Sequence, residues 1–141
     1  RLAAGPVTHR RAVTFDKRGG FWLVEDTLDG SGEHDFKFVF HAAPGRDVRL
    51  IDGSTVEVGD GASGARLLVA SLDAPGGVAL EPRWSSRDYG SKTETVAACW
   101  TLRARAPTGA RWLLLPVGAG EDAAARLELI ARLRTGQYLP R

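Results

Sequence analysis

The chain has 141 residues with one cysteine, three lysines and no apolar run of membrane-spanning length. A single cysteine excludes an internal disulfide, and the position of Cys99 in the apolar run 96–102 predicts a buried, unreactive thiol. There is no run of five like charges and no basic, apolar leader. The composition therefore argues against nucleic acid and against a membrane as partners.

Motifs of self-contained enzymes are also missing. The sequence contains no GxSxG elbow, no P-loop, and no GxGxxG in a strand-helix-strand context. The acidic residues are scattered and do not suggest a pair of carboxylates across a cleft. Nothing in the chain by itself predicts a hydrolase or a nucleotide-dependent enzyme.

The overall composition is that of a compact globular protein. Hydrophobic residues make up 43% and charged residues 26%, which predicts one domain over residues 1–141. Sixteen of the nineteen basic residues are arginine, whose planar guanidinium suits two-point contacts with carboxylate or sulfate. Coding bias is the simpler explanation of the excess, since alanine and glycine are plentiful as well. The chain begins with arginine, and we expect it to be a fragment or a processed piece of a larger protein.

The segment 8–44 predicts three consecutive β-strands. Val13 and Phe15 alternate with polar neighbours, and the same period of two continues through residues 22–28 and 36–40. Glycine-rich turns at 17–20 and 29–32 separate the strands, so two successive hairpins are expected.

The sequence after residue 44 also predicts mainly β-strands. Further strands are expected at 47–51, 55–58, 65–72, 78–80, 93–106 and 111–117. About nine strands with short connections and no alternating helices predict an all-β fold, an antiparallel two-sheet β-sandwich. A polar segment at 81–92 has no period and is expected to form a long loop. The tail 121–135 fits an amphipathic helix or a strand, and helical spacing of its leucines favours the helix.

Two groups of residues carry a family resemblance. The first comprises His9 to Phe15, the strand Phe21 to Asp26, and the histidines His34 and His41; the second is the segment 84–90 with the strand after it. Together they resemble the β-sandwich module of the heparinase II/III-like polysaccharide lyases over about the first 117 residues. The resemblance covers a strand pattern and a few polar positions.

The resemblance implies a function for a larger parent protein. Lyases of this family cleave uronic-acid polysaccharides by β-elimination, using groups that belong mostly to an N-terminal α/α toroid. This chain lacks the long helices of a toroid, so it would be the C-terminal sandwich, inactive alone, with the toroid and an acidic polysaccharide as partners. We expect the parent to be periplasmic or secreted. For the tail, the resemblance favours a strand over a helix.

The resemblance further implies a structural metal, zinc or another divalent ion, held by His9, Asp26 and His41. The first hairpin places His9 opposite or diagonal to Asp26. A second hairpin turning at 30–32 would place Phe36 across from Asp26, and His34 nearer than His41. A cross-strand hydrogen-bonded pair of His9 and Asp26 is the alternative to the metal.

The loop 81–92 offers candidate saccharide contacts. Trp84 and Tyr89 could stack on a pyranose ring, with Arg83 or Arg87 binding a uronate; the two aromatics could equally anchor the loop to the sandwich. Strand periodicity predicts that the other three tryptophans, Trp22, Trp100 and Trp112, lie in the core. His34, at a strand end, is expected at the rim.

Two functional hypotheses follow. The chain is either the supporting sandwich of a heparinase II/III-type lyase, lining one wall of the substrate cleft, or a freestanding carbohydrate-binding or interaction module.

Overall fold

The computed structural model describes residues 5–73 and 77–136. Nine strands and one helix form within these ranges: β1 (Val7–Asp16), β2 (Phe21–Gly30), β3 (Glu33–His41), β4 (Asp47–Asp52), β5 (Thr55–Gly59), β6 (Arg66–Ser71), β7 (Val78–Ser85), β8 (Thr93–Arg105), β9 (Thr108–Val117) and α1 (Ala124–Arg134).

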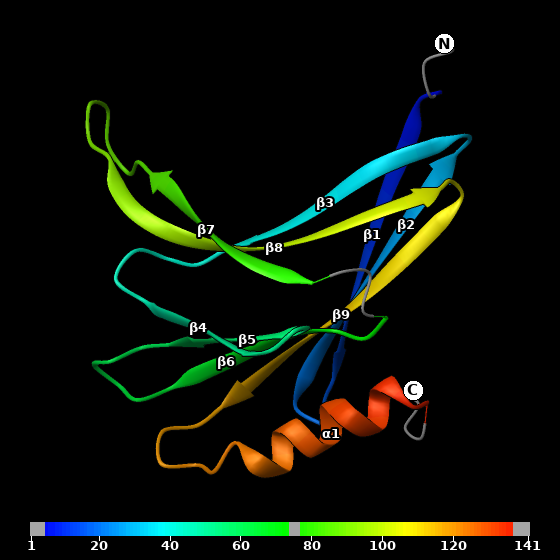
Figure 1. The fold of residues 1–141 in the computed structure, drawn as a ribbon. Coiled ribbons are helices and arrows are strands. Elements are labelled where there is room, and N and C mark those ends of the chain that lie inside the picture. Colours follow the sequence, from blue (N-terminus) through cyan, green and yellow to red (C-terminus); the bar gives the residue numbers. More distant parts are fainter. Residues whose placement is uncertain (1–4, 74–76, 137–141) are drawn as a thin grey trace.

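The strands form two antiparallel sheets of unequal width. The large sheet has the order β1-β2-β9-β6-β5-β4, and the small sheet has the order β3-β8-β7. Figure 1 shows the two sheets close together at one end and diverging toward the other, with α1 on the far side of the large sheet. The predicted all-β two-sheet sandwich with a C-terminal helix is confirmed.

The chain passes between the sheets several times, and two of these crossings share one corner. Ser31 and Gly32 carry it from β2 into β3, while Ala106 and Pro107 carry it from β8 into β9. The amide of Ala106 donates to the carbonyl of Gly32 at 3.0 Å, which ties the two crossings together. The prediction of a second hairpin was therefore wrong: β3 pairs with β8, and Phe36 lies across from Leu102, not from Asp26.

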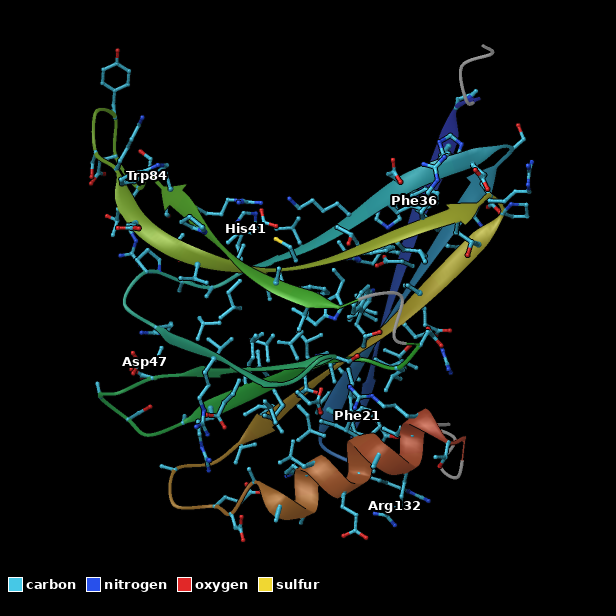
Figure 2. The ribbon with its side chains drawn as sticks, in the orientation of Figure 1. Phe21, Phe36, His41, Asp47, Trp84 and Arg132 are labelled. Atoms are coloured by element: carbon cyan, nitrogen blue, oxygen red, sulfur yellow. The ribbon has the colours of Figure 1, made fainter. Side chains whose placement is uncertain are left out.

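Alternation along each strand builds two apolar layers. Between the sheets, side chains such as Val24, Phe38, Trp100 and Trp112 form one buried cluster. On the opposite face of the large sheet, Phe21 and its neighbours on β6 and β9 pack under α1, whose Ile130 and Leu133 are buried. Figure 2 shows Phe21 beside the helix.

The tail is a helix, as its periodicity predicted. Asp122 accepts a hydrogen bond from the amide of Ala124, and Gly136, at φ 76°, follows the last turn. Arg126 donates to the carbonyl of Gly19, and Arg134 donates to the carbonyls of Ser54 and Ser71. The helix is thus fixed to the sheet by two guanidinium groups as well as by apolar packing.

Two local predictions need correction. The segment 81–92 is not a loop throughout, because β7 extends to Ser85 and leaves only 86–92 as the connection. Trp100 and Trp112 are fully buried, but Trp22 is 39% exposed. It faces the small sheet and lines a pocket together with Phe40 of β3 and Leu114 of β9.

Candidate functional site

A buried carboxylate with four donors lies at the centre of the candidate site. Asp26, between Val24 and Leu28 on β2, has a side chain with no exposed surface. Arg11 donates from Nε to Oδ1 at 2.7 Å and from Nη2 to Oδ2 at 2.9 Å. Trp112 Nε1 donates to Oδ2 at 2.9 Å, and His9 Nε2 lies 2.8 Å from Oδ1. The negative charge is therefore fully bonded inside the protein.

Strand register explains how these groups meet. In the first hairpin Arg11 pairs directly with Asp26, and His9 pairs with Leu28, one diagonal step away. On the other side of β2, Trp112 pairs with Val24 and is again diagonal to Asp26. The strands approach closely here: a Cβ on Gly109 would lie 2.9 Å from the Asp26 carbonyl oxygen, so a glycine fits the position best.

The pKa values of Asp26 and Arg11 both shift in the direction that favours the charged form of each residue. Burial alone would raise the pKa of Asp26, but hydrogen bonds from Arg11, His9 and Trp112 outweigh it and hold the pKa below its usual value. The hydrogen bond to Asp26 in turn raises the pKa of Arg11. The pair stays charged over the physiological range.

The Asp26 carboxylate also orients His9. An ionised carboxylate only accepts hydrogen bonds, so Nε2 of His9 carries the proton that faces it, and Nδ1 of the neutral ring is an acceptor. The His9 side chain is 48% exposed. The imidazole of His9 is thus exposed at the surface, and its hydrogen bond to the buried Asp26 fixes its orientation.

An aromatic pair lies on the same face of the hairpin. The rings of Phe15 and Trp22 are 4.7 Å apart between centroids, and both are exposed. The guanidinium of Arg11 lies over the ring of Phe40, 5.6 Å from its centroid. We call the set His9, Arg11, Val13, Phe15 and Trp22 the β1 strip; its members lie on the face of the first hairpin that turns toward the small sheet and remain partly or fully exposed there.

The predicted metal triplet does not assemble. His9 and Asp26 meet as predicted, but His41 ends β3 in the small sheet, and the hydrogen bonds of Asp26 come from other groups. Among the described residues, no set of three or more His, Cys, Asp and Glu side chains could hold a metal ion. The guanidinium of Arg11 supplies the positive charge beside Asp26, so these residues do not fit a zinc site.

Sequence reasoning missed Arg11 and Trp112 as partners of Asp26. The signal for Arg11 was present, because the hairpin register that placed His9 diagonal to Asp26 places Arg11 directly opposite. The register of the hairpin could not identify Trp112, because this residue lies on β9, eighty-six residues away in the sequence.

The predicted saccharide contacts fall on different surfaces. Arg83 and Trp84 are consecutive on β7 and point to opposite faces of the small sheet. Arg83 binds Glu81, whose pKa is lowered to about 2 by hydrogen bonds from Lys37 and Arg83. Trp84 is 68% exposed and Tyr89 is fully exposed, and Figure 2 shows Trp84 at the end of β7 remote from the helix. Arg87 lies in the connection 86–92.

His34 and a cavity between the sheets offer less chemistry. His34 Nε2 lies 2.8 Å from the carbonyl oxygen of Ser31, at the corner between the sheets, consistent with a rim position. A cavity of about 400 Å³ opens where the sheets diverge; it is lined largely by aliphatic side chains, with His41 among its walls. This cavity therefore resembles a part of the hydrophobic core that the two sheets do not close completely.

In the described ranges, no helix is both long and apolar enough to span a bilayer.

The fold and the site define a class, the β-sandwich module with an exposed histidine supported by a buried acid. The family model described as "Heparinase II/III-like, C-terminal" matches residues 2–117. The chain therefore belongs to the heparinase II/III-like C-terminal family, and α1 lies beyond the matched segment.

Solved structures share the fold. A heparan sulfate lyase, HepC from Pedobacter heparinus, superposes with a TM-score of 0.71 at 19% identity, covering 83% of this chain and 18% of the lyase. A heparinase III superposes with a TM-score of 0.65 at 17% identity, covering 79% of this chain and 18% of that protein. This chain thus spans about a fifth of the length of either enzyme. A search of curated proteins gave no match.

Proposed function

We propose that this chain is the C-terminal sandwich of a heparinase II/III-type lyase, and that its β1 strip lines the substrate cleft opposite a catalytic α/α toroid. The observation that supports the proposal most is the His9–Asp26–Arg11 cluster, a costly buried charge arranged to hold an exposed imidazole.

The strip has the chemistry that an acidic polysaccharide requires. Phe15 and Trp22 offer adjacent aromatic surfaces for the apolar face of a pyranose ring. His9 offers a fixed acceptor to a sugar hydroxyl in its neutral form, and a second donor to a carboxylate or sulfate when protonated. Arg11 lies at the base of the strip, where the Asp26 carboxylate balances its charge.

The steps of β-elimination indicate which role the β1 strip can have in the reaction. A base removes the C5 proton of a uronate, a double bond forms between C4 and C5, and the C4–oxygen bond breaks as an acid protonates the departing oxygen. We assign proton transfer mainly to the toroid and assign substrate positioning to His9, which Asp26 holds in one orientation. The 141-residue chain alone is then inactive. A polymer substrate is too large to enter a cell intact, so we place the parent in the periplasm or outside the cell.

The test uses the full protein encoded by the parent gene. It should release unsaturated uronates from heparan sulfate or a related acidic polysaccharide, as measured by ultraviolet absorbance. The variant His9→Gln, whose amide can still donate to Asp26, should lower kcat/KM at least about tenfold with an unchanged Tm. His34→Gln, at the corner between the sheets, is the matched control and should behave like the wild type.

Two results would count against the proposal. A full-length protein that releases no unsaturated product from any uronic-acid polysaccharide would exclude the lyase function. Equal activity of the His9 and His34 variants would exclude the β1 strip as the cleft wall.

A freestanding carbohydrate-binding module is the second candidate, supported by the exposed Phe15–Trp22 pair and the exposed Trp84 and Tyr89. This function predicts that the isolated chain binds heparin or alginate measurably by calorimetry, and that Trp22→Ala weakens binding. The lyase wall predicts no measurable binding by the isolated chain, because half of the cleft is absent.

A further inference from the structure

The β1 strip has two chemically different ends. His9 lies near the start of β1, and Phe15 lies six residues later on the same face of the sheet. A strand rises roughly 3.3 Å per residue, so about 20 Å separates the two positions. Figure 1 shows β1 running from the corner between the sheets toward α1. The imidazole and the aromatic pair therefore contact different sugars of any polysaccharide that lies along the strip.

The end remote from His9 is an aromatic surface. Phe15 pairs with Trp22 directly across the hairpin, and the two ring centroids are 4.7 Å apart. Phe15 is 48% exposed and Trp22 is 39% exposed, and the neighbouring Val13 is 59% exposed. Adjoining large side chains that stay exposed form an apolar patch, and such a patch marks a binding surface.

The surface between the two ends is open. A pocket of about 460 Å³ lies beside it, lined by Arg11, Val13 and Trp22 of the hairpin and by Phe40 of β3, among others. The guanidinium of Arg11 is bound to Asp26, so its charge is balanced. The middle of the strip thus leaves room for sugar rings, while the exposed aromatic pair offers the stronger contact with them.

We propose that the Phe15–Trp22 pair is a distal subsite of the lyase, which binds a sugar several units away from the uronate that His9 positions. This inference rests on the proposed function and adds a second point of contact to it. The polysaccharide then lies along β1, with its reacting linkage near the corner between the sheets. A pyranose ring further along the polysaccharide stacks on Trp22, next to the hairpin turn at residues 17–20.

Two separated contacts make the reaction depend on the length of the substrate. Binding energy gained far from the reacting bond lowers the barrier only for a substrate that is long enough to reach both contacts. A span of about 20 Å takes several linked pyranose units to cross. A tetrasaccharide cleaved at its central linkage extends two sugars to either side, whereas a decasaccharide extends five. Only the decasaccharide therefore reaches Trp22 while its reacting uronate lies at His9.

The test measures kcat/KM of the full parent protein on size-fractionated oligosaccharides of heparan sulfate, or of whichever uronic-acid polymer the parent cleaves. The wild type should prefer the decasaccharide over the tetrasaccharide by at least about tenfold. Trp22→Leu keeps an apolar side chain against Phe15 but removes the flat indole. It should lower kcat/KM for the decasaccharide at least about fivefold and change the value for the tetrasaccharide by less than about twofold.

Three further variants serve as controls. Trp22→Phe retains a flat ring at the same position and should keep most of the preference for the decasaccharide. Leu50→Ala removes an exposed apolar side chain on β4, outside the β1 strip, and should behave like the wild type on both substrates. His9→Gln should lower kcat/KM for both substrates by the same factor, because His9 acts at the reacting sugar.

Two results would overturn the distal subsite: an equal kcat/KM of the wild type for the two oligosaccharides, or an equal loss on both of them in Trp22→Leu. The first comparison uses the wild type alone, so it does not depend on how well the variant folds. A wild type that cleaves neither the oligosaccharides nor the polymer would instead contradict the proposed function, and the subsite with it.

Discussion

The guanidinium of Arg11 donates hydrogen bonds to both oxygens of the Asp26 carboxylate, at 2.7 and 2.9 Å. Arg11 lies directly opposite Asp26 on the neighbouring strand. The carboxylate is fully buried while the guanidinium is partly exposed. Solvent can thus reach the cation but not the anion, and the anion depends on protein donors for its stability.

Arg11→Met should therefore destabilise the fold strongly. The methionine can fill the space of the arginine stem, but Asp26 would keep only its hydrogen bonds with Trp112 and His9. Since Arg11 is partly exposed, we expect a loss at or just below the low end of the range for a broken buried pair, about 2–3 kcal/mol. Urea unfolding measures it. Arg10→Met, on the opposite face of the same strand, should cost no more than about 0.5 kcal/mol. Equal losses would show that the Arg11–Asp26 pair contributes little.

Asp26 should make stability depend on pH in the acidic range. Its folded-state pKa lies below that of an unfolded aspartate, about 3.9, so its contribution is complete above that value. The contribution is lost as the pH falls through the folded-state pKa. The difference in unfolding free energy between wild type and Asp26→Asn should therefore be largest near neutral pH and shrink below about pH 4. A constant difference across a pH series of urea titrations would contradict this assignment.

The local sequence pattern was sufficient to predict the strands, the two-sheet sandwich and the proximity of His9 to Asp26. Period-two alternation places side chains on faces, and the tight turn at residues 17–20 fixes the register of the first hairpin. These are relations between residues close in sequence.

Pairing between distant strands could not be predicted in the same way. Alternation in β3 is equally compatible with pairing to β2 or to β8, and only the corner at residues 30–32 sends it into the second sheet. The exposure of Trp22 has a similar origin. Its parity correctly directs it toward the small sheet, but parity does not say whether the space between the sheets is filled at that position, where Trp22 lines a pocket.

Helix α1 should be required to cover the outer face of the large sheet. Ile130 is buried among Phe21 and the leucines of β6 and β9, so Ile130→Ala should cost about 2–4 kcal/mol through lost burial and a residual cavity. Glu128→Ala, exposed on the same helix, should change stability by no more than about 0.5 kcal/mol. Thermal or urea unfolding compares them. An equal, small effect of both would indicate that the helix is not held against the sheet.

Trp112 and Trp100 provide a matched pair for the hydrogen bond to Asp26. Their rings are 5.0 Å apart and both are fully buried, but only Trp112 donates its indole N–H, to Oδ2 of Asp26. Trp100 Nε1 has no acceptor among the described residues. Replacement by phenylalanine removes similar ring area at both sites, so Trp112→Phe should cost about 1–3 kcal/mol more than Trp100→Phe. In a double-mutant cycle, Trp112→Phe should also show coupling to Arg11→Met, because both remove donors from one carboxylate. Equal costs and no coupling would mean that the indole N–H does not support the buried charge.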